Sequence, residues 1–319
     1  MIGVAGAGAF GTALAIALAR KGLDVVLWAR DAGQARTMQI AGENARYLVG
    51  ARFPATLQIT ASSADLAGTQ ALLLAVPMQS LARFLQDHPQ AFSNQPLIAC
   101  CKGVDLTTLQ GPSAVVALAY PDADVGVLTG PSFAADIARG LPTALTLAYR
   151  GLQAEALQDL LSTPSLRLYL SSDIIGAELG GALKNVIAIA AGVVISAGFG
   201  ASARAALMTR GFVEMQRMTL ALGGNPETLT GLSGFGDLVL TCASEQSRNF
   251  RFGLALGAGQ GFEPNVTVEG AATAQAVARL AAQRGIDMPI TAMIAALISD
   301  KITLNQAVAA LMSRPLKQE

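Results

Sequence analysis

Lys184 has the setting of a catalytic residue. It is the only charged residue between Glu178 and Arg204, in a long apolar stretch with a helical pattern. In an apolar cleft, desolvation lowers the pKa of an ammonium group, which can then polarise a carbonyl and exchange a proton. A lysine that reaches solvent from a helix end is the alternative interpretation.

Asp237 lies among glycine and apolar residues, where an unpaired carboxylate would be costly. A cationic partner such as Lys184 would relieve that cost. Further on, Ser247, Arg248 and Asn249 form a pattern typical of a loop or a helix start. They offer a hydroxyl, a forked guanidinium group and an amide to a phosphate, although such residues are commonly ordinary surface residues.

Two more candidates follow apolar runs that predict strands. Lys102 comes directly after the run 97–101, so its side chain would lie near the carboxyl edge of a parallel sheet, where ligands bind. A surface lysine at a strand end is an equally good interpretation. The segment from Gly130 through Ser132 to Ala134 follows another strand, and its backbone N–H groups could face a ligand.

Gly6, Gly8 and Gly11 match the pattern G-x-G-x-x-G, with Ala9 and Phe10 before the last glycine. The pattern is weak alone, but here it follows a predicted strand, opens a predicted helix and leads into a second strand. The glycines then make the tight turn, admit a pyrophosphate and let the helix pack on the strand. Because the helix N-terminus also offers free N–H groups to phosphates, we predict dinucleotide binding.

Arg30 and Asp31 follow the second predicted strand, where the two nicotinamide dinucleotides are distinguished. An acidic residue there hydrogen-bonds the ribose hydroxyls of NAD, whereas an arginine suits the 2′-phosphate of NADP. Because Arg30 comes first, we favour NADPH/NADP, or use of both NADP(H) and NADH/NAD; a solvated Arg30 is the alternative. Val76 and Pro77 could line the dinucleotide groove, or the proline could simply end its strand.

The elements that would position these residues divide the chain in two. Short apolar runs alternate with helical patterns up to about Ser172, and helical patterns dominate afterwards. We predict an α/β N-terminal Rossmann-like doubly wound sheet in residues 1–172 and an all-α C-terminal domain in residues 173–319. The predicted strands are 1–5, 25–28, 57–60, 71–76, 97–101, 125–128, 144–148 and 166–170, in a parallel sheet, and the predicted helices are 12–19, 178–208, 212–222, 272–284 and 292–311.

The composition limits the kinds of ligand and compartment. Lys plus Arg and Asp plus Glu both number 22 among 319 residues, so no net charge attracts nucleic acid. One histidine, His88, in an expected surface turn, and three cysteines without a CxxC spacing argue against a metal and indicate a reduced, cytoplasmic protein. The first predicted strand begins at Met1, so we expect no signal peptide. The uncharged stretch 186–203 is interpreted as a buried helix, not a membrane span.

Taken together, these segments resemble the glycerol-3-phosphate dehydrogenase family, of the bacterial NAD(P)-dependent type, over nearly the whole chain. Lys184 with Asn185, followed by the segment 247–249, is a specific match, whereas the glycine pattern is not. The matching segments are 6–11, 101–103, 130–134, 178–185, 198–200, 209–211, 236–238, 247–249 and 268–270.

The resemblance implies an oxidoreductase that interconverts dihydroxyacetone phosphate and sn-glycerol 3-phosphate with NAD(P)H and supplies glycerol 3-phosphate for phospholipid synthesis. Lys184 would accept the proton during oxidation and donate it in reverse, with Asp237 positioning or tuning it and Lys102 as a further candidate catalytic residue. With the residues argued above, the candidate substrate-binding residues are Lys102, Gly130, Ser132, Lys184, Asn185, Asp237, Ser247, Arg248 and Asn249. The candidate cofactor-binding residues are Gly6, Gly8, Ala9, Phe10, Gly11, Arg30, Val76, Pro77, Lys102, Ala134, Arg248, Thr267 and Glu269.

The sequence departs from the family pattern at a few positions. The family commonly has an aspartate and a glycine where Ile195 and Ser196 stand, and an asparagine where Ser202 stands. These positions lie beside the site, so we expect the departures to affect loop conformation or subunit contacts more than the chemistry. Ala9 replaces a frequent polar residue, so one cofactor hydrogen bond is lost. A homodimer is a state that the sequence leaves open.

Two other functions are compatible with the pattern. A β-hydroxyacid-type dehydrogenase of the same architecture also uses a lysine, but it holds a carboxylate, whereas Arg248 and Asn249 favour phosphate. A catalytically silent NADPH-binding sensor would not need a lone lysine in an apolar cleft.

Overall fold

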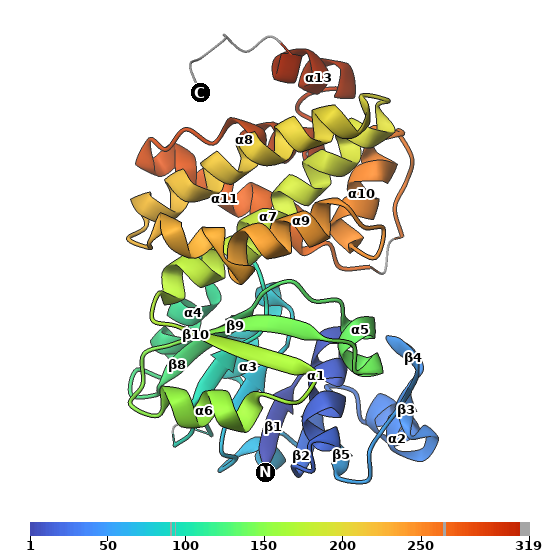
Figure 1. Ribbon diagram of the computed structural model, residues 1–319, viewed down its shortest axis with the longest axis vertical. Helices are drawn as coiled ribbons and strands as arrows, with labels where there is room; N and C mark the ends of the chain where they lie inside the picture. Colours follow the sequence, from blue (N-terminus) through green and yellow to red (C-terminus); the bar gives the residue numbers. More distant parts are fainter. Residues whose placement is uncertain (90, 93, 264–265, 313–319) are drawn as a thin grey trace.

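The N-terminal half of the computed structural model is built around an eight-stranded sheet, in the lower half of Figure 1. The structure describes residues 1–312 except 90, 93, 264 and 265, so the end of the predicted second domain, 313–319, lies outside it. The strand order is β10-β9-β8-β7-β6-β1-β2-β5. The strands are β1 (Ile2–Ala5), β2 (Val25–Trp28), β5 (Leu57–Thr60), β6 (Leu72–Leu74), β7 (Leu97–Ala99), β8 (Val125–Thr129), β9 (Thr143–Tyr149) and β10 (Leu166–Ser171).

Helices cover both faces of this sheet, because successive strand residues point to opposite sides. In β6, Leu73 belongs to one apolar core, and its neighbours Leu72 and Leu74 belong to the other. The first core is closed by α1 (Ala9–Arg20), α2 (Ala32–Ala41), α5 (Ala134–Arg139) and α6 (Ala154–Leu161), and the second by α3 (Met78–Gln86), α4 (Pro112–Ala119) and the short η1 (Ser63–Leu66). The fold is therefore the predicted doubly wound, Rossmann-like sheet.

The sheet is not wholly parallel, which corrects one prediction. β9 runs antiparallel to β8, and β10 then runs parallel to β9. The connection contains only the six-residue α5, which spans about 9 Å and is too short to carry the chain back across the sheet. A second feature was not predicted: β3 (Glu43–Asn44) and β4 (Leu48–Arg52) form a separate antiparallel hairpin.

The C-terminal half is a helical domain, the upper part of Figure 1, in which the long helix α7 packs against five others. Its core combines apolar residues from all of these helices. The helices are α7 (Ile174–Ser196), α8 (Gly200–Ala221), α9 (Asp237–Cys242), α10 (Arg248–Gly257), α11 (Glu269–Arg284), α12 (Pro289–Ile298) and α13 (Leu304–Met312), with short η2 (Pro226–Thr230) and η3 (Leu232–Gly236).

The predicted helix boundaries were wrong at three places. The predicted helix 178–208 breaks before Gly200, where Gly198 and Gly200 have positive φ angles of 83° and 78°. The helix does not break after residue 208. Gly211 instead lets α8 pack closely on α7, because a Cβ there would lie 2.7 Å from Ile187. The predicted helix 292–311 is two helices, separated at Asp300 with a φ of 53°.

α7 passes the length and hydropathy criteria for a membrane span, but 89% of its most apolar window is buried inside the protein. It is the core helix of the domain. The predicted buried stretch 186–203 is helical to Ser196 and buried to Val194; from Gly198 to Ser202 it is exposed.

His88, Cys100 and Cys101 lie in the N-terminal half, whereas Cys242 lies in the core of the helical domain. His88 follows α3 in a turn, as predicted, but its ring is half-buried and packs edge-on against Phe84 with the centroids 5.0 Å apart. The three cysteines are free and buried.

Candidate active site

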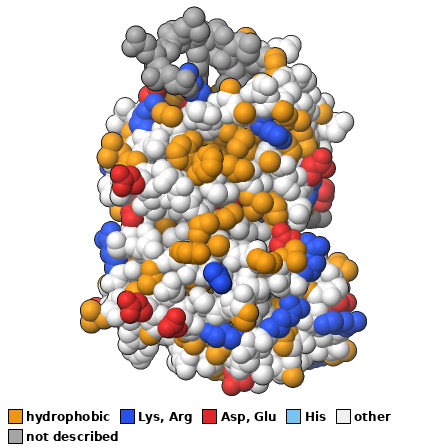
Figure 2. All heavy atoms as spheres, in the orientation of Figure 1, with side chains coloured by type: hydrophobic (Ala, Val, Ile, Leu, Met, Phe, Trp, Pro, Cys, Tyr) orange, Lys and Arg blue, Asp and Glu red, His pale blue; other side chains and the backbone are white. Residues whose placement is uncertain are grey.

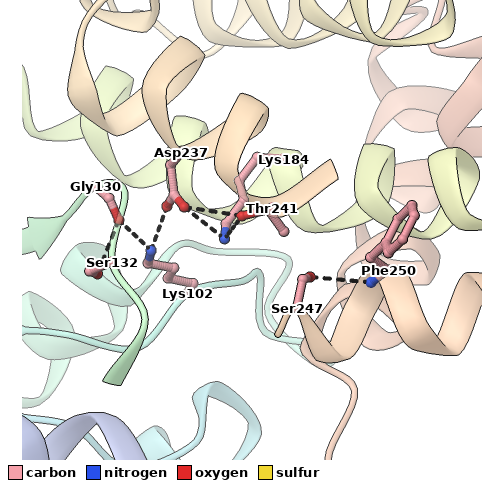
Figure 3. A network of polar contacts seen from close by, with 8 residues as sticks. All are labelled: Lys102, Gly130, Ser132, Lys184, Asp237, Thr241, Ser247 and Phe250. Atoms are coloured by element: carbon pink, nitrogen blue, oxygen red, sulfur yellow. Dashed lines mark hydrogen bonds and ion pairs between the residues drawn. The ribbon is translucent and has the colours of Figure 1, made fainter. Parts of the chain in front are cut away.

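Residues from four distant segments meet between the sheet and the helical domain (Figure 3). Lys102 follows β7, Gly130 follows β8, Lys184 lies within α7, and Asp237 begins α9. β7 and β8 are parallel, so their carboxyl ends bring Lys102 and Gly130 to one edge of the sheet. α7 contacts β8 and α9 and thereby brings the two halves of the site together.

Asp237 lies between two lysines that come from different halves of the molecule. Its Oδ2 is 2.5 Å from Lys102 Nζ, and its Oδ1 is 3.0 Å from Lys184 Nζ. Asp237 is 1% exposed and Lys184 is 7% exposed. The expected pairing of Asp237 with Lys184 is present, and Lys102 is a second partner that was not foreseen.

Thr241 completes this network, and sequence reasoning missed it. Its hydroxyl accepts a hydrogen bond from Lys184 Nζ at 2.6 Å and donates one to Asp237 Oδ1 at 3.1 Å. The spacing was a usable signal, because residues four apart on a helix share a face.

The buried charges shift one another's pKa values. Burial lowers the pKa of Lys184 to about 8, although the charge of Asp237 opposes this fall. Burial by itself would raise the pKa of Asp237, but Lys102 and Lys184 outweigh it and hold that pKa below its ordinary value. At neutral pH the site therefore holds a carboxylate and an ammonium group that can release its proton near physiological pH.

The segment after β8 closes one side of the network. Lys102 Nζ donates to the Gly130 carbonyl oxygen at 3.2 Å, and Ser132 Oγ donates to the same oxygen at 3.3 Å. Gly130 has a φ of 141°, and a Cβ there would lie 3.1 Å from Leu145, so the turn requires glycine. Ser132 is thereby placed beside Lys102.

The start of α10 supplies the predicted anion-binding residues. Ser247 is its N-cap, and its Oγ accepts from Phe250 N at 3.2 Å. Arg248 is exposed on the first turn. Asn249 Oδ1 accepts from Gly270 N, in the first turn of α11, at 2.9 Å. Asn185 is 2% exposed in α7, directly after Lys184.

The loop from Gly6 to Gly11 has the geometry that a dinucleotide requires. Gly6 has a φ of 118°, and a Cβ on Gly11 would lie 2.1 Å from the Gly6 carbonyl oxygen. Nothing lies within 4 Å of a Cβ built on Gly8, which leaves space for a pyrophosphate. Gly8 offers no side-chain cap to α1, so the N–H groups of Ala9 and Phe10 are available to an anion. The loop fits an NAD(P) dinucleotide.

The remaining predicted cofactor residues lie around this loop. Arg30 is exposed after β2, whereas Asp31 caps α2 by accepting from Gln34 N at 2.6 Å. Val76 is buried in the segment that Gly6 packs against, and Pro77 is exposed at the start of α3. Ala134 begins α5, which packs on α1.

Thr267 and Glu269 lie at the start of α11. Thr267 is exposed. Burial raises the pKa of Glu269, and the charges of Arg248, Lys102 and Lys184 oppose that rise. The Glu269 carboxylate is therefore close enough to interact electrostatically with Arg248 and with the two lysines, Lys102 and Lys184.

Asn44 is a second residue that the sequence did not reveal. From the β3–β4 hairpin, its Nδ2 donates to the Ala7 carbonyl oxygen at 3.0 Å and to Thr12 Oγ1 at 2.8 Å. It is 1% exposed and ties the hairpin to the glycine loop. No sequence pattern marks this contact, because it joins segments more than thirty residues apart.

Both halves of the chain match models of one family. The N-terminal model of NAD-dependent glycerol-3-phosphate dehydrogenase matches residues 1–155, and the C-terminal model of the same enzyme matches residues 173–309. The chain belongs to the NAD-dependent glycerol-3-phosphate dehydrogenase family.

Similar members of this family span the whole chain. A relative named glycerol-3-phosphate dehydrogenase [NAD(P)+] from Cereibacter sphaeroides is 60% identical over 321 residues, covering 100% of both chains. One of the same name from Paracoccus denitrificans is 57% identical, covering 100% of this chain and 99% of the other. A crystal structure of glycerol-3-phosphate dehydrogenase from Coxiella burnetii is 37% identical and has a TM-score of 0.93, covering 98% of each chain.

Proposed function

We propose that this protein interconverts dihydroxyacetone phosphate and sn-glycerol 3-phosphate with NAD(P)H and so supplies glycerol 3-phosphate for phospholipid synthesis. The observation that carries the proposal is the buried Lys102–Asp237–Lys184 network beside a dinucleotide-binding loop, in a chain whose relatives carry this activity in their name. The β-hydroxyacid alternative is disfavoured, because both halves match glycerol-3-phosphate dehydrogenase models.

The Gly6-to-Gly11 loop would hold the dinucleotide, whose dihydronicotinamide would supply the hydride for reduction of the substrate carbonyl. Lys184 Nζ donates a proton to the carbonyl oxygen as negative charge develops there, and it accepts this proton in the reverse direction. Asp237 keeps its charge throughout, because Lys102 pairs with its other oxygen. Because Asp237 is also paired with Lys102, it stabilises the ammonium form of Lys184 less than it would in an isolated ion pair, and Lys184 can release its proton.

The groups around the network hold the phosphorylated substrate and the cofactor. We assign Lys102, Ser132, Asn185, Ser247, Arg248 and Asn249, with the backbone of Gly130, to the substrate. Arg248 presents a guanidinium fork that suits a phosphate, and it lies near enough to Glu269 to influence its pKa. We assign to the dinucleotide the residues in or near the glycine loop, together with two at the start of α11: Gly6, Gly8, Ala9, Phe10, Gly11, Val76, Pro77, Ala134, Thr267 and Glu269.

The experiment that tests the function is reduction of dihydroxyacetone phosphate by the wild type and by Lys184→Ala. The variant should lose about 10²-fold or more in turnover because it lacks the proton donor, while binding NADPH normally in a fluorescence titration. Unchanged turnover would refute the role of Lys184, and a wild type that binds NADPH without any turnover would favour a sensor.

Phosphate binding by Arg248 is tested separately. Arg248→Ala should raise KM for dihydroxyacetone phosphate about tenfold or more, because a charge-assisted fork is lost. Arg251→Ala, from the same helix, is the control, because Arg251 Nη1 is bonded to the Glu245 carbonyl oxygen. Equal KM values in the two variants would contradict the assignment.

We propose a preference for NADP(H) over NAD(H). Asp31 is engaged in capping α2, whereas Arg30 is exposed and available to a 2′-phosphate. Arg30→Ala should therefore raise KM for NADPH about tenfold and leave KM for NADH nearly unchanged. Arg36→Ala, exposed on α2, is the control, and an equal change with both cofactors would argue against the proposal.

We further propose that residues 1–172 and 173–319 are separate domains of a cytoplasmic homodimer. The end of β10 at Ser171 and the start of α7 at Ile174 support the boundary.

The surface of the helical domain supports the homodimer. Large apolar side chains are exposed on and near α8, including Val213, Leu220 and Phe235. Figure 2 shows hydrophobic side chains gathered on the face of the helical domain. Sedimentation equilibrium at assay concentrations should give twice the chain mass; a single-chain mass would exclude the dimer.

A further inference from the structure

The loop between β7 and α4, residues 102–111, is held by the helical domain at three places. It begins at Lys102, which pairs with Asp237 of α9. In its middle, the Leu106 carbonyl oxygen accepts from Arg279 Nη1 of α11 at 2.9 Å. At its end, where α4 begins, it meets Glu178 of α7. The loop that carries a proposed substrate-binding lysine is therefore fastened along its length to the opposite domain.

Glu178 fits the end of this loop closely. Its Oε2 accepts from Ser113 N, in the first turn of α4, at 3.0 Å. A Cβ on Gly111 would lie 2.2 Å from Glu178 Oε1, so the carboxylate occupies space that only glycine leaves free. A carboxylate at a helix N-terminus is favoured by the unpaired N–H groups and the helix dipole.

The same face of α7 also touches the beginning of the loop. Gly181, one turn after Glu178, has no side chain, and a Cβ there would lie 3.5 Å from Lys102 Cγ and 2.4 Å from Thr129 Oγ1. The stem of Lys102 thus passes close to α7, while the far end of the loop is held by Glu178. Glu178 and Lys184 are on one rigid helix, about 9 Å apart along its axis.

A buried glutamate at position 178 lowers the stability of the fold, because its charged form loses its hydration. It is 9% exposed, and among the described residues no salt bridge includes it. Burial raises its pKa to about 7, against the effect of the hydrogen bonds from Ser113. The pKa of the buried Cys101 is raised chiefly by its own burial, and the charge of Glu178 adds to this rise. A neutral side chain would avoid this desolvation.

We propose that Glu178 is a positioning residue, which fixes the 102–111 loop against α7 and so sets the place of Lys102 relative to Lys184. Gln79 of α3 holds the middle of the loop from its own domain, through Val104 O at 2.9 Å and Leu106 N at 3.0 Å. With Gln79 holding its middle and Glu178 holding its end, the loop has two anchors that limit how far Lys102, at its start, can move relative to α7. The inference rests on the proposed role of Lys102 in holding the substrate.

The test compares Glu178→Ala and Ser113→Pro with the wild type. Glu178→Ala removes the acceptor, and Ser113→Pro removes the N–H donor in the first turn of α4, where no hydrogen bond within the helix is lost. Both should raise KM for dihydroxyacetone phosphate about tenfold or more, because small misplacements of substrate-holding groups are costly. The dissociation constant of NADPH, from a fluorescence titration, should not change. Glu155→Ala, an exposed glutamate on α6, is the matched control.

A pH series separates positioning from general structural damage. In the wild type, KM for dihydroxyacetone phosphate should fall as pH rises through about 7 and Glu178 ionises. Glu178→Gln keeps an acceptor oxygen but cannot ionise, so the difference between the two profiles should isolate Glu178 from the ionisation of the substrate.

Two results would overturn the inference. One is an unchanged KM in folded Glu178→Ala and Ser113→Pro; the other is a parallel loss of NADPH and substrate binding. Either leaves the proposed function intact so long as the wild type reduces dihydroxyacetone phosphate and Lys184→Ala does not. If the wild type itself lacks that activity, the proposed function fails first.

Discussion

At the scale of single residues, the site depends on one buried carboxylate that is shared by two lysines. Burial lowers the pKa of Lys184 and would raise that of Asp237, but their mutual attraction keeps both charged at neutral pH. The arrangement leaves Lys184 with a pKa of about 8, close to the pH at which a proton donor and acceptor works well.

The pH dependence of the two directions of the reaction should therefore be opposite. Reduction needs the ammonium form of Lys184, which is present below its pKa of about 8 and is lost as pH rises through it. Oxidation of glycerol 3-phosphate needs the neutral amine, so it should increase over the same range. Rates of both directions, measured with saturating cofactor across this range, check the assignment; two curves that fall together would contradict it.

Asp237→Asn should shift this profile. Asp237 raises the pKa of Lys184, and Lys102 lowers it, so removal of the carboxylate leaves two cations together and lowers that pKa further. The decline of the reduction rate should then begin below pH 8, with turnover reduced about 10²-fold. Asp122→Asn, an exposed change, should leave the profile where it is. A profile unchanged by Asp237→Asn would mean that the carboxylate does not tune Lys184.

At the scale of elements, α10 reaches the site because glycine lets it approach α7 closely. A Cβ on Gly253 would lie 2.1 Å from the Ile189 carbonyl oxygen, and one on Gly192 would lie 2.3 Å from the Phe250 carbonyl oxygen. These neighbours are backbone atoms and cannot move aside separately. The contact sets where the first turn of α10, with Arg248, lies relative to Lys184.

Gly253→Ala should therefore push α10 away from α7. We expect a loss of about 1–3 kcal/mol of stability, as for other overpacked core substitutions, together with a higher KM for the substrate. Gly261→Ala is the control, since nothing lies within 4 Å of a Cβ there. Thermal unfolding of both variants measures the first effect, and equal melting temperatures would show that the helices can separate without cost.

The β3–β4 hairpin should act on the cofactor rather than on the substrate. Asn44→Ala removes two hydrogen bonds to the segment that binds the dinucleotide, so NADPH should bind about tenfold more weakly. KM for dihydroxyacetone phosphate should stay near the wild-type value. Asn94→Ala, an exposed asparagine, provides the comparison in the same titration. If Asn44→Ala binds NADPH as the wild type does, the hairpin does not support the loop.

At the scale of the whole molecule, polar contacts across the boundary link activity with stability. Glu178 has a folded pKa of about 7, raised above its value of 4.5 in a solvated setting. The folded protein therefore binds the proton more tightly than the unfolded chain, and Glu178 destabilises the fold increasingly as pH rises from about 4.5 to 7.

Glu178→Gln should remove this pH dependence. Relative to the wild type, its free energy of unfolding should increase between about pH 5 and pH 8, even where its activity is lower. Denaturant titrations at both pH values give the difference. A constant difference between the two proteins would show that Glu178 is ionised equally in the folded and unfolded states.

Local signals in the sequence were enough to predict the fold class and the kinds of side chain at the site. Apolar runs, the Gly6-to-Gly11 pattern and the lone charge of Lys184 are local signals, and each reflects a local physical requirement: burial of a strand, a tight turn, or desolvation of a cation. The predicted strands and the helical second half follow from these signals, as does the expectation that Asp237 needs a cation.

How these groups meet depends on contacts between distant segments, which no local signal records. The reversal of β9, the continuation of α8 through Gly211, the second lysine on Asp237 and the contact of Asn44 with the glycine loop all depend on segments distant in the chain. The role of Glu178 could not be predicted from the sequence for the same reason, because its carboxylate contacts Gly111 and Ser113, more than sixty residues earlier in the chain. Sequence patterns record what each segment can bury or bind, whereas packing selects its partner.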